Sequence, residues 1–276
     1  MRPRKILAIA HKDLSEVRQN TYAWLPMVIV PVMFVIVLPL VMIYLPQVSG
    51  LSAEEMALDD PDIQTFLANM PDTMRQPLEG LSGYAQMIVV MLGFMLAPLF
   101  LILPIMTSSV IAAESFAGER ERGTIEALLY SAASDSDLFL GKALAAAAPA
   151  VLLTWISFAA YVVVLNLASN PIVGRAWFPM STWYPLILWV SPALSLLGTG
   201  ATVLISARVK TFLGAYQTGS MLVLLVLGLL IGQISGVLYL SVDVGMAVGA
   251  LIWLVAGVLL FFGVQTFNRT GLVSSI

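Results

Sequence analysis

The chain alternates between long apolar stretches and short polar segments. A bilayer core about 30 Å thick is crossed by roughly 20 helical residues at 1.5 Å each, and six apolar stretches reach that length. The first runs for about 20 residues, longer than the roughly 7–15 of a signal-peptide core, and no cleavage site follows it. The pattern predicts an all-α integral membrane protein with transmembrane helices at 24–45, 84–113, 138–168, 183–207, 212–240 and 246–267.

Lysine and arginine residues gather on one side of these spans. Of the 13 in the chain, only Arg75 and Arg175 lie on the other side. The remaining residues fall in the N-terminal segment, between the second span and the start of the third, in the loop after the fourth span, and in the tail. Cytoplasmic loops carry such an excess of basic residues. We therefore expect both termini and loop 114–137 to be cytoplasmic, and the acidic loop 46–83 to be external.

Composition supports membrane integration and excludes several kinds of functional site. Hydrophobic residues make up 59% of the chain and charged residues 11%, against about 25% charged in soluble domains. There is no cysteine and a single histidine, His11, so we expect no metal site and no catalytic residues. No charged residue lies near a predicted midplane, which argues against a proton- or cation-coupled carrier. The sequence also lacks a G-x-x-x-x-G-K-[ST] loop for ATP, so any uphill transport must be powered by another chain.

The segment between the second and third spans carries the most specific pattern. Residues 112–142 read AAESFAGERERGTIEALLYSAASDSDLFLGK. Ile125, Leu128 and Leu129 are spaced i, i+3 and i+4, which predicts a short amphipathic helix beginning near residue 123. A mixed-charge collar, 119–122, precedes it.

This segment resembles the cytoplasmic loop of ABC-2-type permeases, in the pattern E-x-x-x-G-E-R-E-x-G-T-x-E-x-L-L followed by S-D-x-x-L-F-L-G-K. The resemblance implies that the loop forms a coupling helix, which docks onto a separate ATP-binding subunit. The coupling residues so implied are Glu119, Arg120, Glu121, Arg122, Gly123, Thr124, Ile125, Glu126, Leu128 and Leu129.

The resemblance extends to the plan of the whole chain, 1–276, as a single permease domain. Residues 4–20 place Ile6, Ala10, Leu14 and Val17 on one stripe, the pattern of an interfacial helix, and the family implies such an elbow helix before the first span. It further implies a homodimer or heterodimer of permeases among membrane lipids, with ATP and Mg on the partner ATPase, no cofactor in this chain and no nucleic acid. The implied function is ATP-driven export of a hydrophobic or amphipathic substrate across a prokaryotic plasma membrane by alternating access.

Two sets of residues inside the membrane are candidates for a substrate path. Four hydroxyls share one face of the fourth span, where they either line a polar passage or pack against neighbouring helices. Three methionines form a flexible apolar stripe on the second span, which the resemblance places, with the fifth span, at the central cavity of a dimer. The candidates are Ser191, Ser195, Thr199 and Thr202, and Met87, Met91 and Met95.

Two other functions remain open at this point. A membrane anchor of an ATPase complex with a mechanical or regulatory role would share the ATPase partner but move no substrate. A secondary carrier or channel would have no ATPase partner at all.

Overall fold

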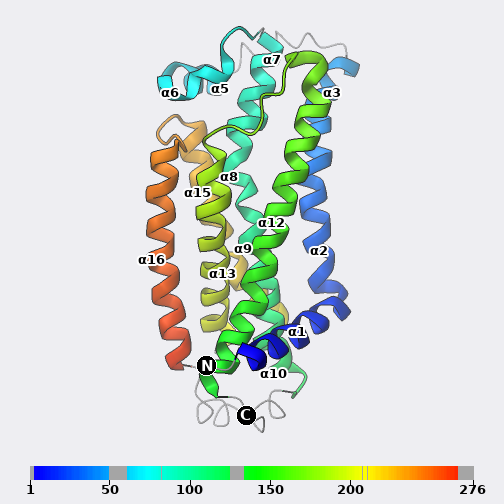
Figure 1. Ribbon diagram of the computed structural model, residues 1–276, viewed down its shortest axis with the longest axis vertical. Helices are drawn as coiled ribbons and strands as arrows, with labels where there is room; N and C mark the ends of the chain where they lie inside the picture. Colours follow the sequence, from blue (N-terminus) through cyan, green and yellow to red (C-terminus); the bar gives the residue numbers. More distant parts are fainter. Residues whose placement is uncertain are drawn as a thin grey trace.

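The computed structural model describes residues 3–49, 61–81, 83–124, 134–206, 208–209 and 211–266. Regular structure in these residues is helical throughout, and six helical segments are long and apolar enough to cross a membrane. They stand side by side as a bundle (Figure 1). The six expected spans are confirmed, at Thr21–Val48, Gly83–Glu121, Asp137–Val173, Pro185–Ser206, Phe212–Ile234 and Val242–Gln265.

Helix α1 (Pro3–Gln19) lies across one end of the bundle, and the first span turns away from it (Figure 1). Asn20 separates them because its backbone is extended, and its side-chain oxygen accepts a hydrogen bond from the Tyr22 N–H at 3.1 Å. This N-cap starts the first span, which consists of α2 (Thr21–Val32), the π-helical turn η1 (Met33–Val37) and α3 (Leu38–Ser49).

The second span ends two turns later than the sequence pattern predicts. We expected a loop from residue 114, but the chain stays helical to Glu121. Gly123, at φ +69°, then ends the helix: Thr124 N–H donates to the Glu119 carbonyl at 3.0 Å and Gly123 N–H to the Arg120 carbonyl at 3.1 Å. These two bonds form a Schellman motif. The span comprises α7 (Gly83–Ile88), η3 (Val89–Met95), α8 (Leu96–Phe100), α9 (Ile102–Ala113), η4 (Glu114–Gly118) and α10 (Glu119–Glu121).

The second and fourth spans form the centre of the bundle. In their most apolar stretches 83% and 72% of residues are buried, against 17–28% in the other four spans. Around this centre stand the third, fifth and sixth spans (Figure 1). The third is α12 (Asp135–Val173), the fourth η5 (Pro185–Val190) with α13 (Ser191–Ser206), the fifth α14 (Phe212–Ser220) with α15 (Val223–Ile234), and the sixth α16 (Val242–Thr266).

Three successive carbonyls of the π-helical η3 tie the second span to its neighbours. The Leu92 carbonyl accepts from the Tyr161 hydroxyl at 2.8 Å, that of Gly93 from Trp183 Nε1 at 2.6 Å, and that of Phe94 from Gln233 Nε2 at 2.6 Å. A π-helical segment disturbs the regular i→i+4 bonding of a helix, and here side chains from three other parts of the bundle bond to its carbonyls.

Short helices cover the other end of the bundle, within the expected loop 46–83. They are α5 (Pro61–Asn69), α6 (Asp72–Arg75) and the 3₁₀ turn η2 (Gln76–Leu78). Phe66 is fully buried against Phe94 and Tyr239, and Arg175 donates to the Pro77 carbonyl at 3.0 Å. These contacts fasten α5 and η2 to the bundle.

Candidate functional site

A cluster of charged side chains joins α1, the end of the second span and the start of α12. We call it the ion cluster. Three of its four carboxylates and one of its three cations are buried, which is unusual because a buried charge is stable only when it is paired and hydrogen-bonded. Its members are Lys12, Asp13, Glu16, Glu114, Glu119, Arg122 and Lys142.

Lys142 is the buried centre of the ion cluster, only 2% exposed. Its ammonium lies 2.8 Å from Glu119 Oε2 and 3.2 Å from Asp13 Oδ2, and it donates to the Ser115 carbonyl at 2.7 Å. The Phe116 ring lies beneath it, 5.5 Å from centroid to nitrogen. The ammonium is therefore hydrogen-bonded to Asp13 and Ser115 and ion-paired with Glu119, and three helices are held at one atom.

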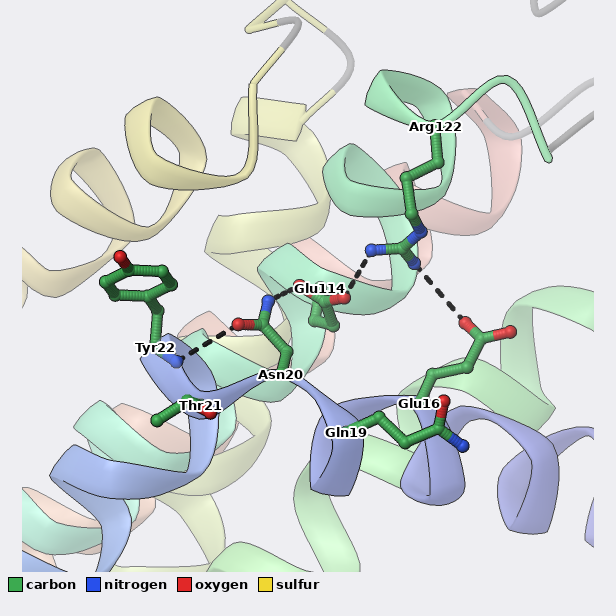
Figure 2. Close-up of a pocket in the computed structure, with 7 residues that line it drawn as sticks. All are labelled: Glu16, Gln19, Asn20, Thr21, Tyr22, Glu114 and Arg122. Atoms are coloured by element: carbon green, nitrogen blue, oxygen red, sulfur yellow. Dashed lines mark hydrogen bonds and ion pairs between the residues drawn. The ribbon is translucent and has the colours of Figure 1, made fainter.

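Lys12 and Arg122 complete the cluster at its half-exposed rim. Lys12 donates to Glu119 Oε1 and lies 2.9 Å from Glu16 Oε1. Partial burial lowers the pKa of Lys12, but the bonds to Glu119 and Glu16 outweigh it, so this pKa is raised and the ammonium stays charged. Arg122 Nη1 donates to Glu114 Oε1 at 2.5 Å, and Asn20 Nδ2 donates to the other oxygen of Glu114 at 2.9 Å (Figure 2).

The residues between Glu119 and Arg122 reach two further helices. Arg120 Nη1 donates to the carbonyl of Ser206, the last residue of α13, at 2.8 Å. Glu121 Oε2 accepts from the N–H of Phe212, the first residue of α14, at 2.8 Å. The last turn of the second span thus contacts α1, α12, α13 and α14, and a displacement of that turn acts on all of them.

Comparison with known proteins identifies the family. A protein-family model described as “ABC-2 family transporter protein” matches residues 7–250. The chain belongs to the ABC-2 transporter family. This permease is the membrane component of a transporter, and membrane subunits of this family lack ATPase domains. Searches of curated proteins and of solved structures returned no match.

The structure places part of the expected coupling segment inside the permease. Glu119, expected in an exposed collar, is fully buried and bound to Lys12 and Lys142. Arg120, Glu121 and Arg122 also bond within the chain, while Gly123 and Thr124 are exposed. Ile125, Glu126, Leu128 and Leu129 lie outside the described residues, so their docking role stays a prediction.

Sequence reasoning missed two buried members of the ion cluster. Asp13 and Lys142 are buried, yet we assigned no role to either of them. A signal for Asp13 exists in the sequence: it follows Ala10 by three residues and precedes Val17 by four, so it lies on the apolar stripe of α1. A carboxylate in that position requires a buried cation, and Lys142, the eighth residue of α12, is that cation.

Three carboxylates of the ion cluster, from Asp13, Glu16 and Glu119, offer oxygens within 4.8 Å of one another. Such a group resembles a metal site. However, the ammonium groups of Lys12 and Lys142 bond to these same carboxylates. The lysines supply the positive charge that a metal ion would otherwise bring, so we interpret the group as a structural ion cluster.

The candidate substrate-path residues lie mostly in the interior of the permease. Ser191, Ser195 and Thr199 each donate to the carbonyl four residues earlier, and all three are fully buried with Thr202. This arrangement fits helix packing better than an open passage. Of the methionines, Met95 is buried, and Met87 and Met91 are half-buried on the enclosed second span. A role for either set in substrate contact stays a prediction.

Proposed function

We propose that this permease is the membrane-spanning subunit of an ATP-driven exporter, which moves a hydrophobic or amphipathic substrate by alternating access across a prokaryotic plasma membrane. Membership of the ABC-2 family over residues 7–250 carries the proposal. The lack of charged residues near the predicted midplanes of the spans supports it, because a carrier driven by an ion gradient usually keeps ionisable residues deep in its spans. ATP and Mg then belong to a separate ATP-binding subunit.

The end of the bundle formed by α1 and α10 is proposed as the cytoplasmic end. The basis is the distribution of lysine and arginine, of which only Arg75 and Arg175 fall on the opposite side. Glu121 and Arg208 then face the cytoplasm, and helices α5 and α6 face outward. In this orientation α1 is the interfacial elbow helix of the permease.

Coupling to the ATPase is proposed to begin immediately after Gly123, where the chain leaves the second span. Two apolar residues, Leu128 and Leu129, form the docking face of the predicted coupling helix, and two ATPase subunits dock on a dimer of permeases. The ion cluster supports this proposal, because it links the helix turn just before the docking segment to α1 and α12. The fifth span is buried over only 17% of its most apolar stretch, which leaves a face for a second copy or a close relative.

Replacing a docking leucine tests the coupling proposal. Burial of one leucine at an interface contributes about 1.5–3 kcal/mol, and an aspartate would add an unpaired charge in an apolar cleft. We expect Leu128→Asp and Leu129→Asp to abolish substrate-stimulated ATPase activity and to weaken co-purification of the ATPase. The matched control is Glu121→Gln, which keeps an oxygen to accept from Phe212 and should be mild, since exposed pairs contribute about 0–1 kcal/mol. If both leucine variants couple normally, the docking assignment is wrong.

The rival functions are separated by one reconstitution. In liposomes that hold the permease and its ATPase, an exporter shows ATPase activity that rises with an amphipathic substrate. A membrane anchor with a mechanical or regulatory role shows ATPase activity without that rise. A secondary carrier or channel shows flux in the absence of any ATPase.

A further inference from the structure

An open cleft lies beside the ion cluster, where α1 meets the first span (Figure 2). Its volume is about 590 Å³, within the roughly 300–1,000 Å³ of ligand-binding clefts. Glu114, which is 1% exposed, forms part of the lining, and Glu16 and Arg122 stand at the side opposite Tyr22. The cleft therefore offers both signs of charge within one small space, with two carboxylates and one guanidinium.

Several donors in the cleft are unused. A guanidinium has five N–H groups, and Arg122 directs two of them to Glu114 and Glu16. The other three meet no acceptor among the described residues. The side chains of Gln19 and Thr21, which also line the cleft, form no hydrogen bond to any residue that the structure describes. These groups suit a phosphate, while the half-exposed carboxylate of Glu16 suits an ammonium group.

An exposed apolar stripe runs along the first span from the cleft. Tyr22 lines the cleft, and Leu25, Ile29, Val32 and Ile36 follow it at alternating spacings of three and four residues, so they share one helix face. Their exposed fractions lie between 41% and 84%. A polar cleft that continues into an apolar stripe matches the shape of a membrane lipid, with its headgroup above its acyl chains.

The depth of the cleft in the membrane also fits a lipid headgroup. The first span from Thr21 to Val48 has 28 residues, about 42 Å at 1.5 Å per residue, so it exceeds an apolar core of about 30 Å. Its first turn therefore reaches the headgroup layer, where tyrosine and tryptophan side chains such as those of Tyr22 and Trp24 are favoured.

We propose that this cleft binds the phosphoethanolamine headgroup of a membrane lipid, with the phosphate at Arg122 and Gln19, the ammonium at Glu16, and an acyl chain along the stripe below Tyr22. The lining of Glu16, Glu114 and Arg122 has a net charge of −1, and Lys12, 2.9 Å from Glu16, brings the sum to zero. A neutral site matches a zwitterionic headgroup better than a purely anionic one. A choline headgroup carries no N–H to donate to Glu16. This binding is independent of the coupling assignment, and it would place a lipid in contact with Arg122, just before the proposed docking segment.

The test is a lipid titration of the full-length permease in detergent, read by native mass spectrometry. Phosphatidylethanolamine, phosphatidylcholine and phosphatidylglycerol with identical acyl chains are compared. We expect the first to bind at least about fivefold more tightly than the third, the size of one partly exposed ion pair. Glu16→Gln should reduce that preference below about twofold, and Gln19→Ala, which removes no bond within the described residues, should weaken phosphatidylethanolamine binding about twofold or more.

Matched variants at the other end of the bundle, Glu79→Gln and Gln76→Ala, should leave lipid binding unchanged. Equal affinity for the three lipids, or equal effects of Glu16→Gln and Glu79→Gln, would overturn the proposal. So would glycerophosphoethanolamine binding as tightly as the whole lipid, because the ligand would then be a soluble compound. If phosphatidylethanolamine binds the monomer and dissociates on dimerisation, a second permease covers the stripe and the proposal is also wrong.

Discussion

Lys142 offers the sharpest test of the ion cluster, because one substitution removes its buried cation. In Lys142→Met a side chain of similar length keeps the apolar packing of α12 but leaves Asp13 and Glu119 short of a partner. Both carboxylates are buried. Glu119 retains Lys12, whereas Asp13 keeps, among the described residues, only a longer pair with the same Lys12, at 3.6 Å. The variant therefore leaves a buried charge at Asp13 without its closest partner.

The magnitude follows from the loss of that partner. Removing one partner of a buried ion pair costs about 3–5 kcal/mol, and we expect a loss of about 3 kcal/mol in the free energy of unfolding because Lys12 covers part of the deficit. The control is Lys12→Met. Lys12 is 42% exposed in its side chain, solvent weakens its pairs, and Lys142 still neutralises Glu119, so about 1 kcal/mol is expected. The measurement is reversible unfolding of the purified permease by SDS in mixed micelles.

A double variant shows whether charge isolation is the cause. Lys142→Met with Asp13→Asn removes the stranded carboxylate, and we expect it to recover at least about 1 kcal/mol relative to Lys142→Met alone, since contacting residues show coupling energies of about 0.5–3 kcal/mol. A loss below about 1 kcal/mol in Lys142→Met, or simple addition of the two single effects, would refute the view that this cluster holds α1 to the bundle.

The remaining predictions concern sidedness, energy source and packing. A cysteine label at Arg175 should react from outside intact cells and one at Glu121 should not; the reverse result would invert the topology. With ATP supplied, transport should survive an uncoupler, and its collapse would indicate coupling to a proton gradient. A Cβ at Gly198 would lie 2.4 Å from Ser108 Oγ, while one at Gly228 meets nothing within 4 Å; Gly198→Ala should destabilise the chain by about 1–3 kcal/mol, and Gly228→Ala should leave the unfolding curve unchanged.

The spans could be read from the sequence because membrane insertion depends on a sum over many residues. About twenty apolar side chains in succession leave little freedom for another structure, so errors were confined to the ends. The largest error was the end of the second span. We took Glu114 as the start of a loop, since an isolated carboxylate favours water, but Arg122 and Asn20 satisfy it eight and 94 residues away along the chain. Local sequence patterns cannot predict a helix end that depends on such distant partners.

The candidate site could be predicted from the sequence only in part, for the same reason. The family pattern marked residues 119–124 as a special segment, but it gave no indication of which of them face inward. Glu119 and Glu121 look alike in the sequence, yet one is buried against Lys142 and the other is exposed beside Phe212. Only the arrangement of α1, α12 and α14 distinguishes them. Likewise, the hydroxyl of Ser195 suggests a polar passage until its bond to the Ser191 carbonyl is known.

The close contact between α9 and α13 gives the second span the geometry of a lever. Gly198 of α13 meets α9 at Ser108, and from there the helix extends about 20 Å to Glu121 and about 38 Å to Gly83, at 1.5 Å per residue. If the span pivoted there as one body, together with the side chains that bond to η3, the short arm would carry the ion cluster, and the long arm would end beneath the α5 and η2 layer. A 1 Å push on the short arm would move the far end by about 2 Å in the opposite direction. A small displacement at one face of the membrane would thus produce a larger displacement at the other.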